Sequence, residues 1–426
     1  MPLQSDVPCK KLSVQFDSVE SDSPDMIKLK KAIESKFRIT NKVLRMTGMF
    51  FEDSAKCSAN RPMYWFKVVR AFVLFGLAVH QTSWLLYHIL SSKKYDETTA
   101  RSLVIFNWML QATISEAIFI YWQMKGYITR LYQNVHCPKG CCRTVIVINQ
   151  TLFATFSLFG VFILMTATTV ILAWMGKGEF VMFDPGLLEA YGPKSLSIIS
   201  ILIHMHALFV WISILTFYIL IGRAVQHELL VFNDSLRNIG TIIPGDSEKL
   251  CEELSERYAT HVQLANRIRV ADSTFEVYTF AMVGTNIPTT IFTLLTFFLA
   301  LQSSCWTKIL ISSPDVLFCI CELIGLTAAP AKVHAAIREV ESIVYGNLRI
   351  WTPFNEKVYQ LASVFISHAN QSNLGITLWG FAVVTKPLIL TTMSLTVTYL
   401  TFLLQVQYKD DPCTPNSNST SHFVIS

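Results

Sequence analysis

The chain has 426 residues, of which 52% are hydrophobic and only 15% are charged, whereas an average soluble domain has about 25% charged residues. With a mean hydropathy of +0.41, it cannot present enough charge to water to form a soluble globular protein. We therefore expect an all-α protein that crosses a membrane several times, and the net charge of +5 gives no reason to expect a nucleic-acid partner.

The first 63 residues form a segment without a membrane span and without a signal peptide. Its start, through Asp25, is rich in Ser and Asp and is expected to be disordered. Residues 26–46 place apolar side chains at helical spacing among Lys and Arg, which predicts an amphipathic helix at the membrane surface. Because 11 Lys and Arg precede residue 64, the positive-inside rule puts residues 1–63 in the cytoplasm.

Long apolar stretches predict seven transmembrane helices within residues 64–407. An odd number of spans leaves residues 408–426 as an extracellular tail, in which Asn418 begins a glycosylation sequon. The loop charges agree with this orientation except in the first outside loop, which is basic. The expected spans are Tyr64–His88, Arg101–Met124, Thr144–Trp174, Ser195–Ile221, Phe275–Leu301, Ser313–Ala331 and Gly375–Gln407.

Aromatic and polar residues alternate in the span halves that we expect to face outwards, a mixture typical of a small-molecule pocket. Each such residue also has a simpler interpretation, since a lone Trp more often packs or anchors at the interface, and a lone His is more often a bonded core group. The candidate ligand-binding residues are Trp84, Asn107, Trp108, Thr166, Thr169, His204, His206 and Asn286.

Ionisable residues inside spans are costly and usually face a cavity or a partner. Glu322 in the sixth span and Lys386 in the seventh both lie near mid-membrane by the expected boundaries, so we predict an ion pair between them. Glu116 in the second span is the competing partner. Pro387 beside Lys386 predicts a kink, and with it a hinge, in the last span.

Two long connections, residues 223–274 and 332–374, are rich in both charges and in apolar residues at helical spacing. We therefore expect cytoplasmic helices there instead of loops. Such helices need a partner for their apolar faces. Packing within one subunit and a shared base that joins subunits both meet that need, and the shared base is favoured.

The second half of the last span carries small polar residues on one helix face, because three hydroxyls and one amide follow each other at steps of 4, 3 and 4 residues. Such a face suits a helix that lines a pore. In the alternative, the hydroxyls bond to carbonyls of their own helix and only pack against neighbours. The expected pore-lining residues are Ser394, Thr398, Thr401 and Gln405, with Phe402 or Leu404 as an apolar constriction.

In the same span, Thr398-Tyr399, five further residues and Gln405 resemble the closing Thr-Tyr-x5-Gln-Phe signature of the insect gustatory receptor family and its nematode relatives. Val406 stands where that family usually has Phe, and the motif covers under a tenth of the chain. The resemblance implies an inverted seven-span receptor. It also implies homo- or hetero-tetramers of related subunits that form ligand-gated cation channels, with the seventh helix around the pore.

Cys305 and Cys413 are the only cysteines expected outside the cell, which makes a disulfide between them possible. The His-Cys-x3-Cys-Cys run at residues 136–142 has zinc-ligand residue types but lacks a second pair, so no metal is expected. The sequence contains no nucleotide-binding loop and no catalytic dyad or triad in a supporting context. We therefore expect neither an enzyme nor a cofactor.

Together these features predict a multi-pass plasma-membrane chemoreceptor of the gustatory type, a subunit of a ligand-gated cation channel that senses a small molecule. The alternatives are a metabotropic seven-span receptor that signals through a partner protein and a light- or peroxide-sensing member of the same family. A transporter is a third class, and no internal repeat in the hydropathy supports it.

Overall fold

The computed structural model describes residues 38–51, 61–92, 97–134, 146, 149–161, 164, 190–191, 197–240, 247–302, 306–371 and 374–409. Its contacts divide the chain into two compact units, Met1–Arg38 and Ile39–Ser426, and Arg38 is the one described residue of the first. Some predictions fall outside the described residues and stay predictions: Thr166, Thr169, Cys305, Cys413, Asn418 and the run at 136–142.

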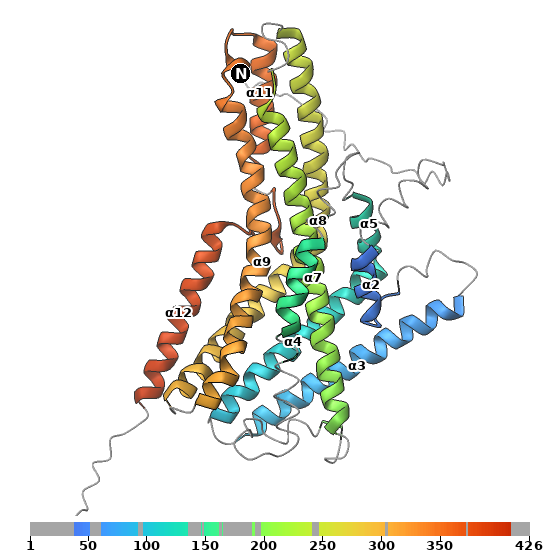
Figure 1. The fold of residues 1–426 in the computed structure, drawn as a ribbon, viewed down its shortest axis with the longest axis vertical. Helices are drawn as coiled ribbons and strands as arrows, with labels where there is room; N and C mark the ends of the chain where they lie inside the picture. The colour runs from blue at the N-terminus through green and yellow to red at the C-terminus, as the bar shows by residue number, and fades with distance from the viewer. Residues whose placement is uncertain are drawn as a thin grey trace, which may run out of the picture. The chain divides into compact units, whose positions relative to one another are not determined.

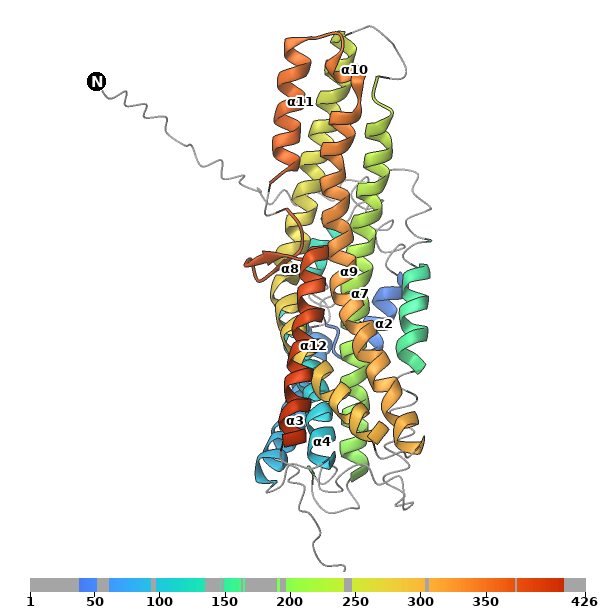
Figure 2. The same ribbon diagram turned by 90° about the vertical axis from the view of Figure 1, so that its left-hand side faces the viewer.

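The described residues are almost entirely helical (Figures 1 and 2), as expected of segments that must satisfy their own backbone hydrogen bonds inside a bilayer. One antiparallel hairpin, in which Thr377 pairs with Val383, supplies the only strands in this part of the chain. The elements are α2 (Arg38–Met46), α3 (Arg61–Ser91), α4 (Glu97–Met124), α5 (Tyr127–Asn134), α7 (Ser197–Arg237), α8 (Ser247–Gln302), α9 (Trp306–Gly346), α10 (Leu348–Trp351), α11 (Glu356–Ala369), β1 (Thr377–Leu378), β2 (Ala382–Val383) and α12 (Lys386–Lys409).

Six of the described helices are long and apolar enough to cross a membrane, namely α3, α4, α7, α8, α9 and α12. They correspond to six of the seven predicted spans. The predicted third span, Thr144–Trp174, is described only at residues 146, 149–161 and 164, all of which are helical. The multi-span helical fold is therefore confirmed, and the seventh span stays a prediction.

The three longest helices extend well beyond what a bilayer needs. α7 and α9 have 41 residues each and α8 has 56, whereas about 20 residues cross the hydrocarbon. We call the described part of residues 223–274 and 332–374 the polar bundle. The sequence predicts cytoplasmic helices in the connection before the fifth span, and the structure continues the last of them into that span as one helix, α8.

The polar bundle is held together by an apolar face and by ion pairs. Asn355 caps α11 by accepting hydrogen bonds from the backbone N–H groups of residues 357 and 358. α11 then packs on α8 and α9. Its fully buried Phe365 lies 5.6 Å, between ring centroids, from Tyr258 of α8. Arg267 donates to Glu228 at 2.9 Å and ties α8 to α7. The apolar faces of these helices therefore have partners within one subunit, and the shared base that joins subunits stays a prediction.

The last span begins later than the sequence predicts. The prediction starts it at Gly375, but residues 377–383 form the β1–β2 hairpin, and α12 starts only at Lys386. The predicted kink at Pro387 is also wrong. Pro387 lies in the first turn of α12, where a missing backbone N–H leaves no hydrogen bond unmade.

Candidate functional site

α12 lies at the edge of its unit (Figure 1) and has few partners within its own chain. Its apolar window is 17% buried, which is close to the 11% of α3 and far below the 50% to 61% of α4, α7, α8 and α9. It contacts α8 and α9. Its buried residues, Thr392, Thr396 and Leu400, follow each other at steps of four and so form one contact stripe.

The predicted polar stripe lies on the opposite side of α12. At about 100° per residue, it is turned roughly half a circle away from the contact stripe. The side of α12 that faces away from its own chain therefore carries the hydroxyls and the amide. Ser394, Thr398, Thr401 and Gln405 are all exposed, Phe402 is exposed, and Leu404 is half-buried.

The hydroxyls bond to carbonyls of their own helix, as one interpretation predicts, and are also exposed, as pore lining requires. The Thr398 hydroxyl donates to the Ser394 carbonyl at 2.9 Å, and the Thr401 hydroxyl donates to the Val397 carbonyl at 2.8 Å. The protons are thus used within the helix, but the exposed hydroxyl oxygens keep lone pairs that accept hydrogen bonds from outside. The stripe is therefore an acceptor surface with one amide, at Gln405.

The structure gives Glu322 a different partner from the one predicted. Glu322 is fully buried in α9, and its Oε2 accepts a 2.6 Å hydrogen bond from Asn286 of α8. Lys386 is exposed at the start of α12, so the predicted ion pair is not formed. The reason is the late start of α12, which places Lys386 at a helix end instead of mid-membrane.

A second polar cluster lies on α4. Asn107 and Gln111 are one helical turn apart, and Glu116 follows. All three are buried, and among the described residues the Asn107 Nδ2, both amide atoms of Gln111 and both carboxylate oxygens of Glu116 have no hydrogen-bond partner. A buried polar group left unpaired costs about 1–3 kcal/mol. Asn107 and Gln111 share one side of α4 and are suited to hold a polar molecule, whereas Glu116 is turned about 180° around the helix from Asn107 and lies on another side.

Two other elements reach Glu116. His206 of α7 places its Nδ1 3.9 Å from Glu116 Oε1. Its Nε2 donates to the Thr47 carbonyl at 2.9 Å, so in the neutral ring Nδ1 is the hydrogen-bond acceptor and faces Glu116. The buried segment after α2 therefore contributes to the surroundings of Glu116. His206 and Asn107 are among the residues predicted from the sequence, whereas Gln111 is not; its spacing of four residues from Asn107 was the available signal.

The remaining predicted ligand residues are distributed over several helices. Trp108 of α4 meets Phe318 of α9 at 6.0 Å between ring centroids, and Trp211 of α7 meets the same ring at 5.3 Å. His204 is buried in α7, and Trp84 of α3 is half-buried. Trp108 therefore shares an aromatic cluster next to the α4 polar residues, and Trp84 is not shown to join it.

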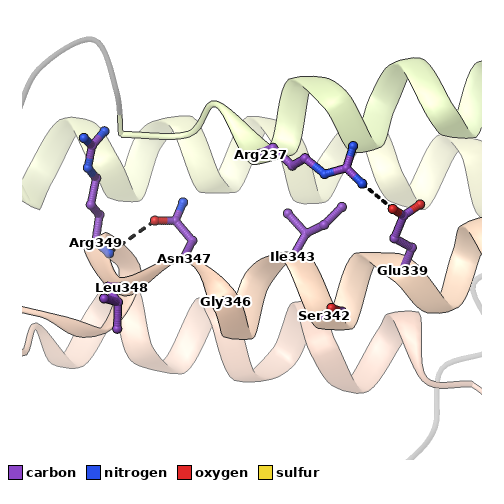
Figure 3. A pocket seen from close by; sticks show the side chains of 8 residues that line it. All are labelled: Arg237, Glu339, Ser342, Ile343, Gly346, Asn347, Leu348 and Arg349. Atoms are coloured by element: carbon purple, nitrogen blue, oxygen red, sulfur yellow. Dashed lines mark hydrogen bonds and ion pairs between the residues drawn. The ribbon is translucent and has the colours of Figure 1, made fainter.

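A cleft with a volume of about 490 Å³ lies at the far end of the polar bundle (Figure 3). Arg237 of α7 makes an ion pair with Glu339 of α9 across it. Arg349 donates to the Gly240 carbonyl at 2.7 Å, and Asn347 donates to the Ile239 carbonyl. Because its arginines are already used in these contacts, we assign the cleft the structural role of tying α7 to α9 and α10.

Two histidines meet inside the polar bundle. Nδ1 of His261 in α8 lies 3.2 Å from Nδ1 of His368 in α11. Burial, and then the neighbouring His368, lowers the pKa of His261 to about 4. Burial, and then Arg269, lowers the pKa of His368. The pair is neutral at physiological pH and helps to join α8 to α11.

Comparison with known proteins connects this arrangement to one receptor class. No curated protein sequence matches the chain. Two solved structures of the insect olfactory receptor OR5 from Machilis hrabei, one of them in complex with eugenol, have a similar fold, with a TM-score of 0.67 and 15% identity. Each match covers 90% of this chain and 100% of the other. The family profile described as 7tm Chemosensory receptor matches residues 123–410, about two thirds of the sequence, so the chain belongs to the 7tm chemosensory receptor family.

Proposed function

We propose that this chemosensory receptor is a gustatory-type subunit of a ligand-gated cation channel in the plasma membrane. The observation that carries the proposal is the outward face of α12, on which Ser394, Thr398, Thr401 and Gln405 are exposed opposite the contact stripe. A polar face of a membrane helix needs water or other polar partners. Several copies of α12 around one axis would supply both, and a tetramer is the assembly that we propose.

The ligand is a small molecule held by Asn107 and Gln111 of α4. Their unpaired amide nitrogens and the unpaired Gln111 carbonyl oxygen call for a ligand that both accepts and donates hydrogen bonds. The similar olfactory receptor structure was solved with eugenol, which supports a small-molecule ligand. The protein is not an enzyme on this proposal, and the ligand acts by shifting α12 between two packings.

Whole-cell recording tests the channel assignment through Gln405. Gln405→Glu places a negative charge on the proposed pore lining, which should raise the permeability to divalent cations relative to monovalent ones. We therefore expect the reversal potential to become more positive when external monovalent cations are replaced by divalent ones. Gln405→Ala should change the conductance in the same assay. The readout is basal current, together with responses to sugars, bitter compounds, peroxide and short-wavelength light.

The matched control is Gln360→Glu, which makes the same charge change on α11, where Gln360 is exposed and donates to Glu356. Its reversal potential should equal that of the wild type. Currents whose selectivity ignores every Gln405 change, and which require G proteins, would replace the channel with a metabotropic receptor.

A further inference from the structure

The hairpin between α11 and α12 presents a cluster of exposed aromatic rings. Trp379 is 54% exposed and Phe381 is 78% exposed, and both lie against Phe280 of α8. The ring centroids are 5.3 Å apart for Phe280 and Trp379 and 6.2 Å apart for Phe280 and Phe381. Apolar rings of this size are rarely left in water without a partner.

The turn that carries these rings has a strained backbone. Trp379 has a φ of 49° and Gly380 has a φ of 73°, the signs of a type I′ turn, and Phe381 N–H donates to the Leu378 carbonyl. Glycine adopts such a φ freely, but a tryptophan loses about 1–2 kcal/mol there. Strain at a residue that makes few buried contacts indicates a role outside the packing of the chain.

The hairpin is also fixed firmly to α8. Asp272 accepts hydrogen bonds from the Thr377 backbone N–H at 2.6 Å and from its hydroxyl at 2.9 Å. Trp379 N–H donates to the Glu276 carbonyl at 3.1 Å. The rings therefore sit at a defined height along α8.

That height is the end of the apolar part of α8. Asp272 and Glu276 are charged, and from Val277 to Gln302 the helix has no charged residue. Val277 and Phe280 are exposed on this uncharged stretch, so the ring cluster continues an exposed apolar side of α8. Lys386, exposed at the start of α12, adds a positive charge at the same boundary. Aromatic rings beside a charge-to-apolar transition are the pattern of a membrane interface.

We propose that Trp379, Phe381 and Phe280 form an interfacial anchor that inserts into the headgroup region of the bilayer on the side of the polar bundle. Its partner is phospholipid. The anchor sets the depth at which α12 enters the membrane, because only Val384 and Thr385 separate the hairpin from the helix.

Photo-crosslinking of the full chain tests the anchor. Phe381→p-benzoylphenylalanine keeps an aromatic side chain at an exposed position, so folding should be preserved. After reconstitution into vesicles of alkyne-bearing phosphatidylcholine and illumination, we expect lipid adducts on this chain. Phe280→p-benzoylphenylalanine is a second reporter on α8 and should give them too.

The control is Phe354→p-benzoylphenylalanine, because Phe354 is 73% exposed but lies in the polar bundle. Lipid adducts at position 381 should exceed those at 354 several-fold. A chain-to-chain adduct at 381 would overturn the proposal and assign the rings to a second copy. Adducts at 280 with none at 381 would also overturn it, since the hairpin would then lie in water.

Discussion

His261 shows how a single side chain makes this protein sensitive to acid. Burial and His368 lower its pKa to about 4, from the usual value of 6.5. The unfolded chain therefore binds a proton below about pH 6.5 that the folded chain does not bind until about pH 4. The contribution of the neutral His261 to stability is fully present above about pH 6.5. As the pH falls from about 6.5 to about 4, the free energy of unfolding decreases by up to about 1.4 kcal/mol per pH unit.

We expect His261→Gln to lessen this loss, because glutamine does not titrate. The measurement is the melting temperature of purified protein in detergent at about pH 7.5 and about pH 5. Between about pH 7.5 and about pH 5, the melting temperature of the wild type should fall further than that of the variant. An equal fall in both proteins would show that the pH dependence arises elsewhere.

The sequence indicates which single residues have unusual chemistry but not which residues they contact. The ionisable and aromatic residues of the spans stood out by type, and His206, Asn286 and Glu322 do lie in polar clusters. Their partners could not be read, because they depend on helix rotation and on where each helix starts. Asn286 rather than Lys386 reaches Glu322 for that reason.

Among the helices, α7 and α9 approach each other closely through small residues. A Cβ added at Gly222 would lie 3.3 Å from the Ala329 Cβ. Gly222→Leu should therefore force the two helices apart and destabilise the fold by about 1–3 kcal/mol. Thermal melting followed by size-exclusion chromatography measures the effect.

Gly76→Leu is the matched control for that substitution. Gly76 is also in a membrane helix, α3, but a Cβ there meets nothing within 4 Å. This variant should melt at or above the wild-type temperature, since leucine favours a helix more than glycine does. Equal destabilisation of both variants would contradict a close α7–α9 contact.

Helices were easier to predict than their ends. Long apolar runs located six described spans, because span length follows from bilayer thickness. The residues from Ile376 to Val384 are mostly apolar as well, so composition merged the hairpin with α12. Gly375 and Gly380 were the available turn signals, and the Asp272 contact that fixes the hairpin comes from more than 100 residues away.

At the scale of the whole molecule, the orientation in the membrane is a prediction that epitope tags test. The positive charge before α3 predicts a cytoplasmic N-terminus, and an odd number of spans predicts an extracellular C-terminus. Antibody should reach a C-terminal tag on intact cells and an N-terminal tag only after permeabilisation. A C-terminal tag that also requires permeabilisation would mean an even number of spans.

The hydrogen bonds between Asp272 and Thr377 fix the hairpin, and with it the start of α12, near the middle of the longest helix, and residues 401–405, past the contact stripe, include no buried residue. If α12 lines a channel, the hairpin is the fixed point about which the whole helix can tilt. Gln405 lies about 28 Å along the helix from Lys386, so a tilt of about 10° moves it by roughly 5 Å, and Ser394 by less than half as much. A slight change of angle at the hairpin is thereby amplified into a wide displacement at Gln405.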